Sequence, residues 1–419
     1  MSSLKIITII SLLVNVIPMS SACALTLEQA WNQVEHKNPR IDAGRAGISI
    51  ARGQQTQAGL LPNPTFTAVQ GSVPGLGKYS NNPNASSTYV INQLIETGSK
   101  RRNRSTVADA QYQESQAVYQ ANSAELYSQT VQAFLGVAEA EAKLRLSKRG
   151  VGINRQTIKT VTQRLNAGRA STLDLSASEI ALSDQRLMEA SIQSELISAR
   201  FALAGLWNGA ESEVQTIKLP SHQNMRLHPL SVYLKRLGKN WDLKAAHQSG
   251  HVAKAEVQLA DSKRYPDVTV GLGFEHFYQN SEPKSHNAAI VELSVPIPIF
   301  DRNQGNVVVA SENYRKSLDV ARYQEQSLRA SIVRTYQAAA QARLQLQTLK
   351  KSILPQSVNT LKLARYGYEQ GRYSYLDLLS AQQKYIDAQM REVSARFQYY
   401  RAWYALQILT GSLPQGVHA

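Results

Sequence analysis

Residues 168–175 read Gly-Arg-Ala-Ser-Thr-Leu-Asp-Leu, and residues 371–378 read Gly-Arg-Tyr-Ser-Tyr-Leu-Asp-Leu. The two segments share Gly, Arg, Ser, Leu, Asp and Leu at matching positions. The Gly of each segment can end a helix in the left-handed conformation, and the Ser-x-x-Asp pattern can cap the start of the next helix. We therefore predict two helical hairpins that are related by an internal duplication.

Heptad patterns of apolar and small residues surround both turns. They run over residues 107–142 and 307–353 in alternating steps of three and four residues. Helices of this kind extend for roughly 60 Å at 1.5 Å per residue, about twice the width of an ordinary domain, so we expect an elongated coiled-coil body. We expect Pro355 to end the second long helix, and a shorter helix to follow the first over residues 152–166.

Alternating apolar and polar residues indicate two pairs of β-strands, one upstream of each long helix. The expected strands are 65–70, 88–95, 268–278 and 289–297, and the last of them places Val291, Leu293, Val295 and Ile297 on one face. Loops rich in Gly, Pro, Asn and Ser, at 72–87 and 279–287, would join the strands of each pair as exposed hairpins. These strands fit either a small soluble sheet or a membrane β-barrel. Four strands cannot close a barrel by themselves, so a barrel would need strands from other chains.

The N-terminus has the features of an export signal. Lys5 precedes an apolar run, and Ala22-Cys23-Ala24 matches a cleavage site, so we expect residues 1–24 to be removed. A lipidated Cys23 is the alternative, although Ser20 stands where a lipobox usually has Leu. No run of 18 or more apolar residues follows Ala24, which excludes a transmembrane helix there.

Composition and motifs exclude several classes of protein. The 419 residues carry a formal charge of +15, with 43% hydrophobic residues and one Cys, which excludes a disordered chain, a disulfide scaffold and a Cys-ligated zinc protein. Motifs for nucleotide binding, serine hydrolysis and zinc proteolysis are absent, so we predict no enzyme and no cofactor. The basic cluster at 100–104 has no nucleic-acid-binding motif beside it. His247 and His251 could share a helical face, but no carboxylate or Cys completes a set, so we predict no metal site.

Two strand–helix–helix repeats behind an export signal resemble the TolC-like family of outer-membrane efflux proteins, over nearly the whole exported chain. Residues 25–30, Leu-Thr-Leu-Glu-Gln-Ala, resemble the usual mature start of that family, and residues 93–101 occupy the strand-to-helix junction of the first repeat. The matching junction at 296–306 reads Pro-Ile-Pro-Ile-Phe-Asp-Arg-Asn-Gln-Gly-Asn. This sequence resembles the corresponding junction in the branch of the family that serves heavy-metal and cation exporters.

The resemblance implies a mainly α fold with a smaller β part. Each of three identical chains would lend four strands to a twelve-stranded outer-membrane β-barrel and its long coiled-coil helices to a periplasmic α-barrel. We divide the chain into a signal peptide at 1–24, repeats at 25–225 and 226–411 that meet in the linker 207–239, and a tail at 412–419.

In function, the resemblance implies the passive outer-membrane channel of a tripartite efflux system of the resistance-nodulation-division type, in a Gram-negative bacterium. The partners would be two further copies of the chain, a periplasmic adaptor, an inner-membrane pump and outer-membrane lipids, with no nucleic acid. Heavy-metal cations are the expected cargo, and drugs or type I secreted proteins are the alternatives. A soluble periplasmic coiled-coil protein such as an adaptor is a further alternative, but adaptors carry a β module between their coiled-coil arms.

The resemblance also assigns roles near the two turns. Asp174 and Asp377 match acids of the gate and of the pore constriction, and Tyr368 matches a tyrosine that helps to hold the tip closed. The turns themselves would dock the adaptor, through Gly168, Arg169, Ser171, Gly371, Arg372 and Ser374. Two departures from the family pattern are Ser380, where well-known members have a second acid, and Tyr373, with which the gate arginine aligns better than with Arg372. The simplest alternative is that both segments are only helical hairpins.

Overall fold

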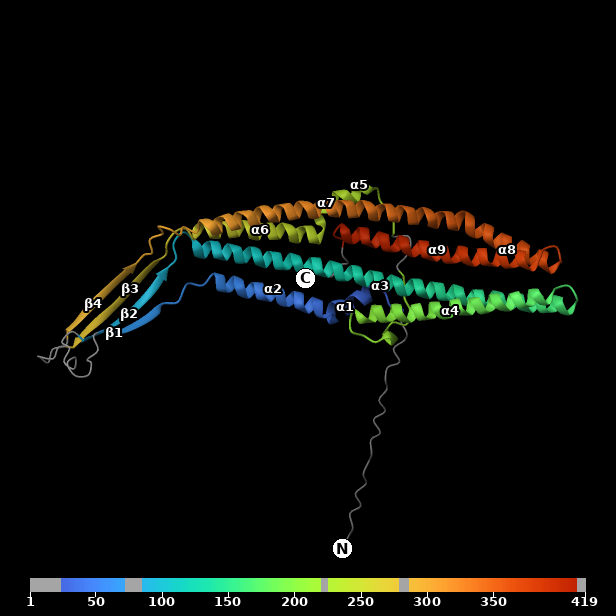
Figure 1. Cartoon of the computed structure of the whole chain (residues 1–419), viewed down its shortest axis with the longest axis horizontal. Coiled ribbons are helices and arrows are strands. Elements are labelled where there is room, and N and C mark those ends of the chain that lie inside the picture. The colour runs from blue at the N-terminus through green and yellow to red at the C-terminus, as the bar shows by residue number, and fades with distance from the viewer. Residues whose placement is uncertain (1–23, 72–84, 220–224, 279–285, 413–419) are drawn as a thin grey trace, which may run out of the picture.

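The computed structural model of the protein describes residues 24–71, 85–219, 225–278 and 286–412. The molecule is elongated: long helices run side by side, and a four-stranded sheet lies at one end (Figure 1). Nearly all of the expected signal peptide, most of both hairpin loops and almost all of the tail fall outside the described residues. No helix within the described ranges is both long enough and apolar enough to cross a membrane.

Two repeats of similar order make up this molecule. The first contains α1 (Leu27–Lys37), α2 (Pro39–Ala58), β1 (Thr65–Gly71), β2 (Ala85–Ile95), α3 (Lys100–Asn166) and α4 (Thr172–Gly205). The second contains α6 (Trp241–Ser262), β3 (Val268–Tyr278), β4 (His286–Ser294), α7 (Gln304–Thr348), the π-helix η5 (Leu349–Ile353), α8 (Leu354–Glu369) and α9 (Tyr375–Leu409). The connection between them contains the short helices η2 (Glu211–Glu213), α5 (Leu230–Lys235) and η4 (Leu237–Lys239). The two halves of the chain therefore have a similar order of helices and strands, as the predicted duplication requires.

The helix α3 is a single helix of 67 residues, about 100 Å long at 1.5 Å per residue. The prediction of a separate shorter helix at 152–166 is wrong, because α3 continues through Gly150 and Gly152 without a break. Gly150 has a packing role instead, since a Cβ there would lie 2.9 Å from the side chain of Gln185 on α4. The glycine allows α3 and α4 to approach closely along the hairpin.

The second long helix also continues past its expected end. Pro355 does not end it; α7 passes into η5 and then into α8, and Leu349 and Leu354 keep right-handed helical dihedral angles at the two joins. Proline has no N–H to donate and crowds the carbonyl four residues earlier, and the wider turn of a π-helix relieves both problems. Pro355 therefore lies in the first turn of α8, and the helix reaches the far end of the molecule.

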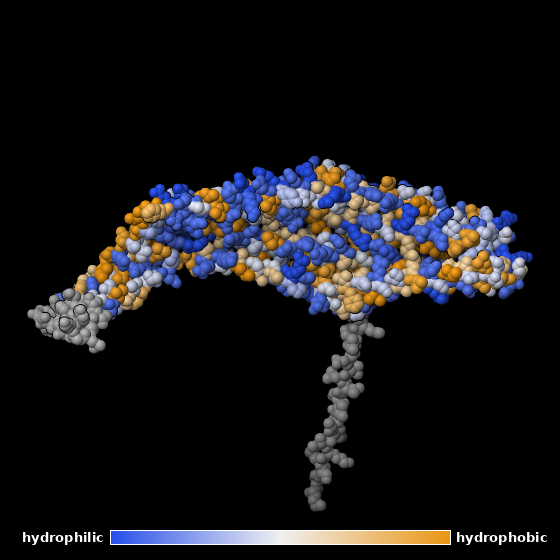
Figure 2. Space-filling view, viewed as in Figure 1, coloured by the Kyte–Doolittle hydropathy of each residue, from blue (hydrophilic) through white to orange (hydrophobic). Residues whose placement is uncertain are grey.

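The strands form one antiparallel sheet in the order β1-β2-β3-β4, close to the predicted positions. One face is apolar, as in a row of paired side chains that are each more than half exposed, namely Phe66, Ile91, Leu272 and Val291. Figure 2 shows hydrophobic surface gathered over the strands. The opposite face is largely polar and includes the row Thr65, Asn92, Gly271 and Glu292. Because β4 ends at Ser294, Val295 and Ile297 lie beyond the strand, contrary to the prediction.

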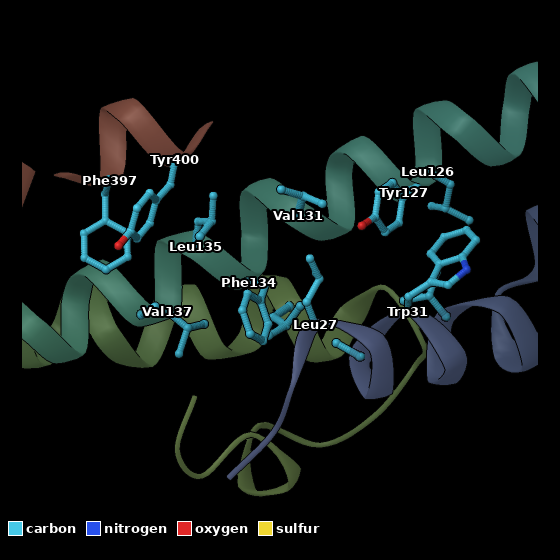
Figure 3. Packing of buried hydrophobic residues seen from close by; sticks show 14 of the residues in the cluster. Leu27, Trp31, Leu126, Tyr127, Val131, Phe134, Leu135, Val137, Phe397 and Tyr400 are labelled. Atoms are coloured by element: carbon cyan, nitrogen blue, oxygen red, sulfur yellow. The ribbon is translucent and has the colours of Figure 1, made fainter. Parts of the chain in front are cut away.

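The main hydrophobic core lies between the sheet and the far end, where α1, α3, α4 and α9 meet (Figure 3). Phe134 of α3 and Phe397 of α9 are fully buried in it. The connection between the repeats belongs to this core too, since Trp207, Val214 and Tyr233 are buried against it. The core fixes the repeats on each other and leaves the two hairpin turns, here called the tip, at the end opposite the sheet (Figure 1). The division of the chain at 225/226 stays a prediction.

Candidate functional site at the helical tip

Both glycine turns have the geometry expected from the sequence. Gly168 and Gly371 have φ angles of 69° and 75°, in the left-handed region that glycine adopts without strain. The backbone N–H of the residue after each Gly donates to the carbonyl five residues earlier, at 2.7 Å in both turns. The two repeats thus end their helices with the same type of turn.

The predicted caps begin the next helix in both hairpins. The Asp174 N–H donates to the Ser171 hydroxyl at 3.1 Å, and the Ser171 N–H donates to the Asp174 carboxylate at 3.1 Å. Ser374 and Asp377 form the corresponding pair, at 3.2 and 2.9 Å. Hydrogen bonds from the Ser374 hydroxyl and N–H hold the pKa of the exposed Asp377 below its usual range. Each acid therefore has a capping role, which the simple hairpin interpretation also explains.

The structure brings the two hairpins of one chain together at the tip. They bury a small core of their own, formed by Val161, Ala364, Tyr368, Tyr375, Leu378 and Ala381. Beside it, the side-chain amide of Gln382 on α9 donates to the Thr157 hydroxyl on α3 at 2.6 Å. The tip is thus a packed unit with its own core, distinct from the main core.

Tyr368 lies inside this contact and is only 3% exposed. Its ring meets the ring of Tyr375 edge-on, with the centroids 6.2 Å apart. Burial raises the pKa of both hydroxyls, to about 12 for Tyr375, and the Asp174 carboxylate raises both further. Of the predicted gate residues, Asp174 thus raises the pKa of the buried Tyr368, whereas Asp377 is exposed to solvent.

The arginine that joins the hairpins is one that the sequence analysis missed. Arg169 and Arg372 are exposed, and among the described residues neither forms an ion pair. Arg164, near the end of α3, instead donates to the carbonyls of Tyr368 and Glu369 at 2.5 and 2.8 Å. Its position in the last turn before a helix-ending Gly was the available signal, because basic residues there often bind terminal carbonyls.

At the opposite end, ion pairs fix the junction between the first strand pair and α3. Lys100 pairs with Asp267 at 2.7 Å, and Arg104 pairs with Glu96. Two of the four charges in the basic cluster at 100–104 are thus neutralised within the chain, while Arg101 and Arg102 remain exposed.

The matching junction at 296–306 uses its polar residues to build the turn into α7. Asn303 has a φ of 59°, its N–H donates to the Asp301 carboxylate at 2.8 Å, and its side chain donates to the Ala260 carbonyl at 2.6 Å. Phe300, in contrast, is 90% exposed. The polar part of this segment therefore has a structural explanation within one chain.

The two histidines singled out from the sequence lie on α6. His247 and His251 are both exposed, and α6 continues through Gly250 between them. In the part of the chain that the structure describes, no group of three or more His, Cys, Asp and Glu side chains could hold a metal ion. The tip is therefore the strongest candidate site.

Comparisons with known proteins agree with this fold. The "Cobalt-zinc-cadmium resistance protein CzcC" of Cupriavidus metallidurans is 28% identical over 396 residues, which cover 93% of this chain and 91% of that protein. The outer membrane protein VceC from Vibrio cholerae has a similar structure, with a TM-score of 0.76 and 18% identity over 92% of this chain and 96% of VceC. The outer-membrane channel OprN gives a TM-score of 0.79 and 18% identity over 92% of this chain and 90% of OprN. The model of the family "Outer membrane efflux protein" matches residues 30–209 and 232–412, and the chain therefore belongs to the outer membrane efflux protein family.

Proposed function

We propose that this protein is the outer-membrane channel of a tripartite efflux system. The observation that carries the proposal is the sheet, which has an apolar and a polar face. Its two edge strands are β1, which pairs only with β2, and β4, which pairs only with β3, so the outer edge of each faces no other strand among the described residues. Open edges leave backbone groups unpaired, which is unfavourable in a membrane. Three copies would pair each β4 with the β1 of the next copy and close a twelve-stranded barrel. The apolar face would then contact outer-membrane lipid, and the polar face would line the pore.

The helices carry a second feature that fits a trimer. Leu173, Ile180 and Leu187 recur every seven residues along α4, and each is more than half exposed in one chain. A heptad stripe of large apolar side chains is typical of a helix that packs against another helix. A neighbouring copy would cover this stripe in a periplasmic tube made of the helices of three chains.

In this proposal the tip is the narrow periplasmic end of the tube. Asp174, Asp377 and Tyr368 would form its gate. The exposed turns would dock a periplasmic adaptor through Gly168, Arg169, Ser171, Gly371, Arg372 and Ser374. An inner-membrane pump of the resistance-nodulation-division type would supply the energy, so the channel itself would be passive.

We propose heavy-metal cations as the cargo. Support comes from the similarity to a protein named for cobalt, zinc and cadmium resistance. The charge of the strands also fits, since their polar face carries Glu275 and Glu292, and the four strands as described contain no Lys or Arg. In a chain with a net charge of +15, this acidic lining would favour cations in the pore.

Deleting the gene tests the cargo. We expect the deletion to lower the tolerated concentration of zinc, cobalt, cadmium, copper or silver severalfold, and we expect a plasmid copy to restore it, because the pump would lose its exit from the periplasm. Growth across metal and drug gradients measures both classes of cargo together. Unchanged metal tolerance with drug hypersensitivity would assign drugs instead, and periplasmic retention of a secreted protein would assign type I secretion.

The structure fits a soluble periplasmic adaptor less well than it fits a channel. The sheet lies at one end of the helical body, rather than between two coiled-coil arms (Figure 1).

A further inference from the structure

We propose that Arg164 holds the two tip hairpins of each chain together and thereby sets how readily the tip opens. This inference rests on the proposed channel function, in which the tip is the narrow end. It makes Arg164 a positioning residue, because it acts through the backbone that carries Tyr368.

The contacts of Arg164 join three backbone carbonyls. One terminal nitrogen of its guanidinium donates to Tyr368 at 2.5 Å and to Glu369 at 2.8 Å, and the other donates to Arg169 at 3.0 Å. Tyr368 and Glu369 belong to the last turn of α8, where carbonyls have no partner within their own helix. Arg164 therefore caps α8 from a different helix and, through Arg169, fixes its own turn as well.

Electrostatics favour the cation at this position. The carbonyl end of a helix carries partial negative charge, which attracts a positive side chain. The guanidinium carbon also lies 4.7 Å from the centre of the Tyr368 ring, a favourable cation–π distance. No ion pair among the described residues involves Arg164, so its charge is balanced by carbonyl groups and an aromatic face rather than by a carboxylate.

The duplication shows that this contact is not a general feature of the turn. Gly367 is the counterpart of Arg164, because each supplies the carbonyl that closes its turn at 2.7 Å. A side chain at Gly367 is blocked, since a Cβ there would lie 2.1 Å from the ring of Tyr373. The first repeat has the small Ala170 where the second has Tyr373. The two turns thus share a backbone conformation but differ in their side chains. The first hairpin supplies the Arg164 guanidinium, and the second hairpin supplies the carbonyls that accept its hydrogen bonds.

Hydrogen exchange on the purified, assembled protein tests the inference. The variant is Arg164→Gln, and the matched control is Arg169→Gln, which removes an equal charge from the same turn but keeps the carbonyl that Arg164 uses. We expect R164Q to speed amide exchange over residues 367–373 about tenfold or more, because hydrogen bonds to a charged donor are lost. The purified sample contains no adaptor, so the proposed docking role of Arg169 does not enter the comparison. We expect exchange in R169Q to stay within about twofold of the wild type, because exposed charges contribute little to stability.

The conservative variant Arg164→Lys covers the case in which R164Q does not fold. A single ammonium cannot reproduce the planar contact with three carbonyls, so we expect faster exchange with R164K as well. In bilayer recordings R164Q should open more often than R169Q. Exchange rates of the Arg164 variants equal to those of R169Q would overturn the inference. A wild-type protein that forms no pore would instead refute the channel function, and the exchange rates would still decide the role of Arg164.

Discussion

A chain in which Gly273 is replaced by Ala is expected to lose the ordered sheet, and with it the ability to form channels in the outer membrane. Gly273 pairs with Val90 of β2 and with Ile290 of β4, inside the sheet. A Cβ at Gly273 would lie 2.1 Å from the Tyr89 carbonyl oxygen and 2.9 Å from the Val90 Cα. Both atoms belong to the backbone of the neighbouring strand, so the clash is relieved only if β2 and β3 separate.

The amount of folded protein in the outer-membrane fraction measures this effect. Overpacking by one side chain typically costs about 1–3 kcal/mol, which lowers the equilibrium ratio of folded to unfolded protein by roughly 5- to 150-fold. Gly136→Ala is the matched control, since it lies in α3 with no atom within 4 Å of an added Cβ and Ala favours a helix. Equal, wild-type amounts of both variants would contradict the close strand pairing at Gly273.

Replacing Asp174 and Asp377 together with Asn is expected to raise the conductance of the channel severalfold and to weaken its preference for cations. In a trimer these positions would place up to six carboxylates near the narrow end, where like charges repel one another and attract cations. Hydrogen bonds from Ser374 lower the pKa of Asp377 and therefore favour its charged form. Asn retains a side-chain oxygen for the helix cap, so the change removes charge and leaves the cap in place.

Bilayer recordings in a salt gradient measure both the conductance and the ion preference. The control is the double variant Ser171→Ala and Ser374→Ala, which removes the serine hydroxyls of both caps but keeps both acids. We expect this control to select cations like the wild type. If it reproduces the effect of the Asn variant, or if the Asn variant conducts and selects like the wild type, the acids act only as helix caps.

Local chemistry in the sequence predicted much of the tip and of the sheet. Gly168 and Gly371 mark left-handed turns because few other residues adopt that conformation without strain, and the two Ser-x-x-Asp caps depend on residues three positions apart. The strands followed from a period of two residues. Such features are fixed by neighbours in the chain, so a single sequence contains them.

The errors and omissions arose where distant segments decide the structure. Pro355 usually ends a helix, but here a π-turn accommodates it and the helix stays packed on α9. The glycine at 150 serves the approach of α4 rather than a break. The place of Arg164 in the last turn of α3 indicates a cation that binds helix-terminal carbonyls, but its acceptors on Tyr368 and Glu369 lie 204 and 205 residues away, and no local pattern identifies them.

Disulfides between the two edges of the sheet test most directly whether three copies close one barrel. Thr67→Cys on β1 is combined in turn with Ala288→Cys, Ile290→Cys or Glu292→Cys on β4; Cys23, the only native cysteine, is expected to leave with the signal peptide. Within one chain β1 and β4 are three strand spacings apart, about 14 Å, whereas a disulfide requires Cα atoms within about 7 Å. Any disulfide must therefore join two copies, and the single variant T67C can at most link pairs. We predict that oxidised outer-membrane fractions contain a covalent trimer and nothing larger for at least one of the three combinations. A monomer in the soluble periplasmic fraction for all three, or a ladder that continues beyond three, would contradict the trimeric channel.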